Sequence, residues 1–207
     1  MTHLTNHLEI EVKFYLKDLD SMRKQILALG AESEKRVFET NIRFEDADKT
    51  LIKKKSLLRL RKDTKTTLTF KSVPDIKDSE FKILNEIEVE VNDFSLMNLI
   101  LESLGFHNEQ AYEKWRESFT IDGTILCLDT LPYGNFLEIE GKKENIKELA
   151  SRLDLKWNKK IILNYLEIFS IIKRQLDLPF SDITFVNFNN IDIDLAGVLA
   201  QINIIPA

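Results

Sequence analysis

Hydrophobic and charged residues alternate without interruption near the start of the chain, over residues 8–14. Ile10, Val12 and Phe14 fall on one face of this stretch, as the period of two in a β-strand requires. The opposite face carries Glu9, Glu11 and Lys13. A face that is merely solvated usually mixes Thr, Ser, Gln and Lys, so an entirely charged face is unusual. The stretch predicts a strand with one apolar face for a core and one face of concentrated charge.

The same kind of face returns in later segments of the chain. Extended structure is predicted over residues 34–46, 57–61, 67–71, 86–91, 110–120, 124–131 and 136–140. The charged faces of these segments carry Arg59, Arg61, Lys71, Glu86, Glu88, Glu90, Lys114, Arg116, Asp129, Glu138 and Glu140. Because successive strands are joined by short links, antiparallel pairing is favoured.

Apolar residues at helical spacing predict helices between the strands. The expected helices cover about residues 18–30, 93–105, 143–154 and 160–175, with Gly30 and Gly105 as stop signals. Amphipathic helices can cover the apolar faces of the strands. The order of elements therefore predicts an α+β fold that is dominated by β-structure, with helices packed on an antiparallel sheet.

The length of 207 residues fits one large domain, since domains of this size are common. We assign that domain to residues 1–175 and treat residues 176–207 as a C-terminal extension, because their periodicity is poor. The extension has three open interpretations: it docks on the domain, plugs one end of it, or forms a contact in a homodimer.

Composition excludes several classes of function. The net charge is −5, so no general basic field attracts nucleic acid. A single cysteine, Cys127, excludes an internal disulfide and a cysteine zinc site. No apolar run approaches the roughly 18 residues of a membrane span, and no signal pattern opens the chain. We therefore expect a cytoplasmic protein with neither nucleic acid nor a membrane as partner.

The charged faces are expected to look at one another. For any single strand a solvated face is the simpler interpretation, but this explanation weakens when five or six strands share the pattern. A closed antiparallel barrel of about eight strands has an interior that holds side chains or one small ligand. Buried ions are costly unless they are paired or bind something. Arginine and lysine suit phosphate oxygens, and carboxylates suit Mg²⁺ or Mn²⁺. Within this set we expect Glu86 to be a solvated rim charge, and we expect Trp115 to be a core residue.

The ordered set of charged strands resembles the CYTH superfamily, also called triphosphate tunnel metalloenzymes. Glu9-x-Glu11-x-Lys13 looks like the ExExK signature of that family. The remaining matches are Arg59-x-Arg61, Thr69-Phe70-Lys71, the Glu86 to Glu90 alternation, Lys114-x-Arg116, Asp129 and Gly134-x-Phe136-x-Glu138-x-Glu140-Gly141. The resemblance covers about residues 8–165.

The resemblance implies a closed eight-stranded antiparallel β-barrel whose tunnel binds a triphosphate and divalent metals, Mg²⁺ or Mn²⁺. It implies a metal site made of Glu9, Glu11, Glu138 and Glu140. It implies phosphate contacts from Lys13, Arg59, Arg61, Lys71, Lys114 and Arg116. It implies that Asp129, together with Glu88 or Glu90, serves a metal or orients the attacking water.

Two departures from the family pattern weaken assignment to one subfamily. The family's second strand usually reads like Asp-x-Tyr-Phe-Asp, whereas this chain has Asn41-Ile42-Arg43-Phe44-Glu45. Glycine often precedes the Arg-x-Arg strand, whereas this chain has Lys55 and Ser56.

Three functions remain open from the sequence. The first is a hydrolase of a triphosphate, either inorganic tripolyphosphate, thiamine triphosphate or a nucleoside triphosphate. The second is a class IV adenylyl cyclase, in which the ribose hydroxyl of ATP attacks the α-phosphorus. The third is a non-catalytic module that binds polyphosphate or nucleotide. Hydrolysis is favoured because water needs no base-recognition pocket, and none is visible in the sequence.

Overall fold

The computed structural model describes residues 8–76, 78–189, 191, 193–195, 197 and 198. The strands are β1 (Leu8–Leu16), β2 (Glu32–Ser33), β3 (Val37–Asp46), β4 (Leu57–Lys62), β5 (Thr66–Ser72), β6 (Lys82–Val91), β7 (Phe106–Ile121), β8 (Thr124–Leu131) and β9 (Gly134–Glu140). The α-helices are α1 (Leu19–Ala28), α2 (Thr50–Lys53), α3 (Phe94–Ser103), α4 (Lys143–Arg152) and α5 (Tyr165–Leu176).

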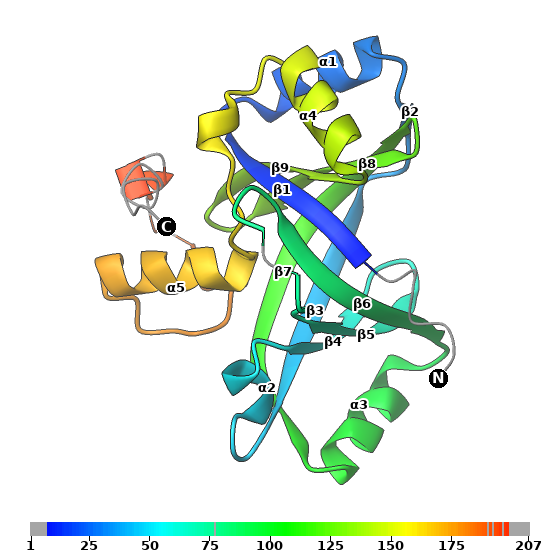
Figure 1. Ribbon diagram of the computed structural model, residues 1–207. Coiled ribbons are helices and arrows are strands. Elements are labelled where there is room, and N and C mark those ends of the chain that lie inside the picture. The colour runs from blue at the N-terminus through cyan, green and yellow to red at the C-terminus, as the bar shows by residue number, and fades with distance from the viewer. Residues whose placement is uncertain (1–7, 77, 190, 192, 196, 199–207) are drawn as a thin grey trace.

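The strands close into a barrel. The sheet runs in the order β2-β7-β3-β4-β5-β6-β1-β9-β8, and β8 pairs again with β7 (Figure 1). The pairings between these neighbouring strands are antiparallel. The short β2 lies on β7 outside the ring, which leaves eight strands in the barrel. The predicted fold class, a β-dominated α+β barrel with helices outside, is confirmed.

The apolar faces of the strands turn outward, toward the helices. One core lies between α1, α4 and the outer faces of β1, β8 and β9, where Val12, Leu126 and Ile139 pack near Ile26 and Ile146. A smaller core lies under α3 and contains Phe44, Leu60 and Leu101. Figure 1 places α1 and α4 together at one end of the molecule and α3 at the other. The interior of the barrel is consequently left to the charged faces.

Helix α5 begins later than predicted. Asn164 caps it, and a reciprocal hydrogen bond from the backbone of Asn164 to Glu167 completes a capping box. Residues before this cap are extended: Ile161 exchanges backbone hydrogen bonds with Lys13, at 2.9 and 2.8 Å. The prediction of a helix from residue 160 was therefore wrong by about one turn, because the strong cap lies inside the apolar periodicity.

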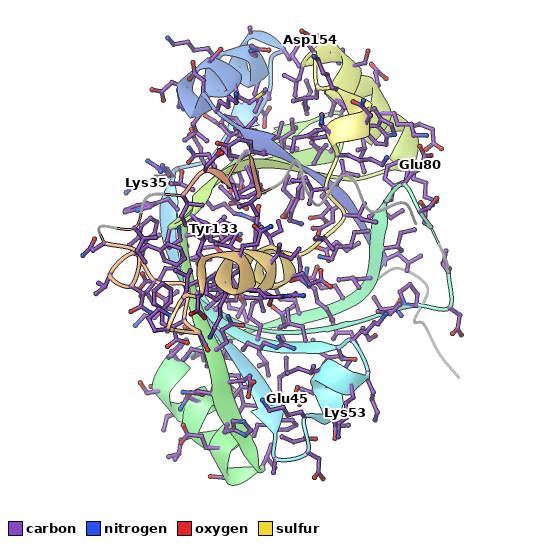
Figure 2. The ribbon with its side chains drawn as sticks, turned by 90° about the vertical axis from the view of Figure 1, so that its left-hand side faces the viewer. Lys35, Glu45, Lys53, Glu80, Tyr133 and Asp154 are labelled. Atoms are coloured by element: carbon purple, nitrogen blue, oxygen red, sulfur yellow. The ribbon has the colours of Figure 1, made fainter. Side chains whose placement is uncertain are left out.

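Helix α5 lies across one end of the barrel. Phe169 and Tyr165 belong to a cluster that also contains inward-facing side chains from one end of the strands. Those side chains are Tyr15, Leu57, Tyr112, Leu131 and Phe136. Seen from that side, α5 crosses the middle of the ring of strands (Figure 2). This end of the barrel is therefore filled by an apolar plug.

The described part of the C-terminal extension docks on α5 and on β7. Leu178, Ile183 and Phe188 are buried in the same cluster as α5. Ile183 donates its backbone N–H to Ala111 at 2.8 Å, and its carbonyl accepts from Glu113 at 2.9 Å. The described residues of the extension thus dock on the domain, whereas the plug itself is formed by α5. Residues 190, 192, 196 and 199–207 lie outside the described part. The division at residue 175 and the homodimer stay predictions.

Across the described residues, we find no helix with the length and apolar character that a membrane crossing requires.

Candidate active site

Cross-strand pairing brings the charged faces together inside the barrel. Residues directly opposite each other on paired strands share a face. Lys13 lies opposite Glu138, and Glu11 lies opposite Glu140. Arg116 lies opposite Asp129. We call the inward-facing charged set the lumen cluster; it comprises Glu9, Glu11, Lys13, Glu39, Arg59, Arg61, Lys71, Lys82, Glu86, Glu88, Lys114, Arg116, Asp129, Glu138 and Glu140.

Asp129 is the most engaged carboxylate of the lumen cluster. Its side chain is fully buried. Arg116 donates to both of its oxygens, at 2.7 and 2.6 Å, in a bidentate fork. Lys114 donates to Oδ2 at 3.2 Å, and Tyr165 from α5 donates to the same oxygen at 2.7 Å. Asp129 therefore orients two candidate phosphate-binding cations rather than standing free.

Lys13 links two carboxylates in the buried part of the cluster. It forms ion pairs with Glu11 and, at 3.0 Å, with Glu138 Oε2. Burial by itself would lower the pKa of Lys13, but Glu11 and Glu138 outweigh it and raise the pKa. Burial and Glu138 would raise the pKa of Glu11, but Lys13 and Lys82 bring it down to about 2. Both members of the pair are thus held in their charged forms.

A second group of acids lies next to this pair. Lys71 donates to both oxygens of Glu9, at 2.6 and 2.5 Å, and lies 3.3 Å from Glu86. Burial and the nearby Glu11 raise the pKa of Glu9 despite Lys71.

The Glu140 side chain has no hydrogen bond or ion pair with any residue that the structure describes. Burial, followed by repulsion from Glu9, Glu138 and Glu11, raises its pKa to about 7. Like charges opposite each other across a sheet are destabilising, and Glu11 lies directly opposite Glu140. This cluster of carboxylates has an excess of negative charge that a cation would relieve.

The donor chemistry of these carboxylates fits a hard divalent cation, which takes oxygen ligands. Within the described ranges, however, no three acidic, histidine or cysteine side chains are grouped closely enough to hold a metal. The reason is visible in the ion pairs: Lys13 and Lys82 hold Glu11, and Lys71 holds Glu9. A metal would have to displace these ammonium groups.

Arginines from β4 form the other wall of the lumen. Arg59 donates to Thr69 at 3.1 Å and to the hydroxyl of Tyr112 at 3.4 Å. Arg61 lies 3.4 Å from Glu88, which also accepts a hydrogen bond of 2.7 Å from Thr69. Glu88 is about one third exposed, at 32%, so solvent reaches this wall more easily than it reaches Asp129.

The three acids of β6 are placed differently from our expectation. The Glu90 side chain is 60% exposed and lies 3.5 Å from Lys65, so the structure does not bring it into the lumen cluster. Glu86 is only 24% exposed and pairs with Lys71 and, at 4.0 Å, with Arg59. The expectation that Glu86 is a rim charge was wrong. Apart from Glu90, every residue proposed for the site lies in the cluster.

Trp115 also differs from its expected place. It is 39% exposed on the outside of the barrel, not in a core. Its ring lies 5.0 Å from that of Phe38 and 5.2 Å from the guanidinium of Arg36.

Several polar residues of the lumen were missed from the sequence. Glu39 is buried and lies 3.4 Å from Lys114 and 3.8 Å from Arg116. Its strand also points Asn41 and Arg43 inward, a period-two signal that was visible in the sequence. Tyr165 gave no such signal, because it lies on a helix and reaches the lumen only through tertiary packing.

Comparisons with known protein families and with related proteins agree with each other. The sequence model of the CYTH domain matches residues 7–171. A protein of Methanocaldococcus jannaschii, whose name assigns it only provisionally to the adenylate cyclases, is 30% identical over 143 residues, covering 68% of this chain and 81% of the relative.

Solved structures share the fold. A Pyrococcus horikoshii protein is 28% identical, with a TM-score of 0.65, over 77% of this chain and 98% of its own. A Hippeastrum protein is 21% identical, with a TM-score of 0.58, over 78% of this chain and 95% of its own. At that identity the second likeness bears on the fold alone. The family match ends inside α5, so the last residues of α5 and the extension over residues 176–207 lie outside it.

Proposed function

Because this chain belongs to the CYTH family, we propose that it is a metal-dependent hydrolase of a triphosphate bound inside the barrel. As a member of that family the chain is an enzyme. The substrate proposed is inorganic tripolyphosphate, thiamine triphosphate or a nucleoside triphosphate.

One observation carries this proposal: acids and bases from distant parts of the chain converge in one buried cluster. Lys114 and Arg116 meet Asp129 and Glu138, and Lys13 joins Glu138 across β1 and β9. Buried ions of this number are costly without a ligand to complete them. A triphosphate would take over the cations, and divalent metal ions the carboxylates, that pair with one another in this structure.

Phosphate binding is proposed for the cations of the cluster. Arginine forks match phosphate oxygens bidentately, and lysines act as point charges. The residues proposed to hold phosphates are Lys13, Arg59, Arg61, Lys71, Lys114 and Arg116. In phosphoryl transfer, catalysis is mainly positioning and charge stabilisation, so these side chains would both orient the substrate and stabilise the charge that develops.

Enzymes of the CYTH family are in general metal-dependent, and we propose Mg²⁺ or Mn²⁺ for this chain. The proposed ligands are Glu9, Glu11, Glu138 and Glu140. A bound divalent cation supplies charge neutralisation on phosphate oxygens and a lowered pKa for bound water.

Among the proposed catalytic acids, placement favours Glu88 for orienting the attacking water. Asp129 is fully engaged with Arg116, Lys114 and Tyr165. Glu90 lies at the exposed rim. Glu88 lies between these extremes: Thr69 and Arg61 hold it in place, and solvent reaches it. In-line attack on the terminal phosphorus would release orthophosphate.

The second candidate is an adenylyl cyclase. The name of the Methanocaldococcus relative assigns it provisionally to the adenylate cyclases. The same phosphate contacts would hold ATP, and the ribose 3′-hydroxyl would replace water as the nucleophile. A non-catalytic binding module is the third candidate, but an anion binder gains nothing from a cluster of acids.

The test offers tripolyphosphate, thiamine triphosphate and ATP separately with Mg²⁺ or Mn²⁺ and separates orthophosphate, pyrophosphate and cyclic AMP. We expect orthophosphate as the main product. Cyclic AMP formed faster than orthophosphate would establish the cyclase instead. Glu9→Gln should abolish metal-dependent turnover in either enzyme, whereas a simple anion binder would bind its ligand as well or better.

A further inference from the structure

Strand β3 contributes two polar side chains to the lumen that the proposed triphosphate site does not use, Asn41 and Arg43. Ile42 and Phe44 pack outward in the core under α3, so their neighbours at 41 and 43 face inward. Asn41 lies opposite Arg61, and Arg43 lies opposite Arg59.

Asn41 is fully buried, and neither its amide nitrogen nor its amide oxygen has a hydrogen-bond partner among the described residues. Thr67 lies on β5 directly opposite Arg61, and its hydroxyl oxygen is likewise buried without a hydrogen-bond partner among the described residues. Burying such groups without partners is costly. This row of side chains therefore offers donors and acceptors to something that is not part of the chain.

Arg43 adds a positive charge without an acidic partner. Arg59, directly opposite, lies 3.6 Å from Glu88 and 4.0 Å from Glu86. Arg43 has no carboxylate within 4.0 Å in the described part of the chain, and its buried Nε is unpartnered. Two guanidinium groups opposite each other on paired strands repel, so an anion between them would convert a destabilising contact into a stabilising one.

We propose that Asn41 and Arg43 form an additional phosphate subsite beside Arg59, and that the substrate class is a linear inorganic oligophosphate with a phosphoryl group beyond the triphosphate. The inference rests on the proposed function and names its substrate class. Arg43 supplies a planar fork for phosphate oxygens, and the Asn41 amide supplies a further donor. An uncharged organic group at this place would leave the positive charge of Arg43 without an anionic partner.

The test compares tetrapolyphosphate, tripolyphosphate and ATP. Tetrapolyphosphate and ATP share a triphosphate and differ in the group attached to its end, a fourth phosphoryl group or adenosine. The wild-type chain should prefer tetrapolyphosphate. Arg43→Gln should lower kcat/KM for tetrapolyphosphate about tenfold or more, as expected for loss of a charged hydrogen bond, and change it for tripolyphosphate by less than about threefold. Arg36→Gln removes an arginine from the exposed outer surface and is the matched control.

Calorimetry of tetrapolyphosphate binding, without metal, gives a readout that does not depend on turnover. Arg43→Gln should weaken this binding and lower its salt dependence. Asn41→Asp, which places a negative charge in the subsite, should weaken it further. Arg43→Lys keeps the charge without the fork and serves if Arg43→Gln fails to fold; it should show an intermediate loss.

The subsite would be overturned if Arg43→Gln lowered kcat/KM equally for all three substrates or for none of them. A wild-type preference for ATP over tetrapolyphosphate would also overturn it. If no triphosphate is hydrolysed at all, the proposed function fails. The subsite is then judged by calorimetry alone: weaker tetrapolyphosphate binding in Arg43→Gln supports it, and unchanged binding overturns it.

Discussion

Tyr165 of α5 donates its phenolic hydrogen to Oδ2 of Asp129 across a distance of 2.7 Å. The acceptor is a fully buried carboxylate that also orients Lys114 and Arg116. The ring of Tyr165 lies 5.1 Å from the Lys13 ammonium and 5.4 Å from that of Lys114. The Tyr165 hydroxyl thus joins the apolar plug to Asp129 of the lumen cluster by a hydrogen bond.

Tyr165→Phe should destabilise the protein by about 1.5–3 kcal/mol, because a hydrogen bond to a buried charge is lost. In a chain of this size the melting temperature should fall by about 2–4 °C per kcal/mol. Tyr133→Phe is the control: the Tyr133 hydroxyl donates to the neutral carbonyl of Tyr165 at 2.9 Å, so its loss should cost only about 1 kcal/mol. Thermal unfolding by circular dichroism measures both, and equal losses would contradict the role of the charge.

Removal of Lys13 should be far more damaging than removal of a surface cation. Lys13→Met leaves Glu11 and Glu138 without their shared buried partner, which should cost about 3–5 kcal/mol in free energy of unfolding. Lys65→Met breaks an ion pair with Glu90 in which the two side chains are 49% and 60% exposed, so the cost should be about 0–1 kcal/mol. Urea unfolding of both variants gives the comparison. A similar loss of unfolding free energy in the two variants would contradict the buried pairing of Lys13 with Glu11 and Glu138.

Glu140 should give the metal-free protein a distinctive dependence on pH. Its pKa is raised from 4.5 to about 7 in the folded state, so between these values the folded chain binds more protons than the unfolded chain. The contribution of Glu140 to stability is therefore present below about pH 4.5 and is lost as the pH rises through about 7. Between pH 5 and pH 7.5, the free energy of unfolding of the wild type should therefore fall relative to that of Glu140→Gln.

Urea unfolding of both proteins at the two pH values, in the presence of a chelator, measures this shift. Because other titrating groups are common to both proteins, they largely cancel in the difference. A difference that does not change with pH would contradict the raised pKa.

The plug should depend on the docked extension. Ile183 is fully buried between α5 and β7, so Ile183→Ala should cost about 2–5 kcal/mol, as other large-to-small core changes do. Val186 is 75% exposed, and Val186→Ala should stay within about 0.5 kcal/mol of the wild type. Limited proteolysis should cut the α5 region faster in Ile183→Ala alone. Equal cleavage of both variants would mean that the extension does not hold α5 in place.

The sequence by itself determined the strands and the inward direction of their charges. The alternation of Glu9, Glu11 and Lys13, and that of Glu138 and Glu140, sets the face of each residue, because the side-chain period of a strand is local and equals two. Cross-strand register makes those faces meet. Closure of the barrel, however, depends on pairs between strands far apart in the chain, β1 with β6 and β9 and β3 with β7.

Only the tertiary structure decided how deep each charge lies and which residues join from outside the pattern. Glu86 and Glu90 share a face of β6, yet the first pairs with Lys71 and the second lies in solvent. Strand tilt and stagger separate them, and local periodicity contains neither quantity. Tyr165 reaches Asp129 because α5 packs across the end of the barrel. Periodicity fixes the direction of a side chain, whereas depth and partnership depend on where the strands and helices meet in space.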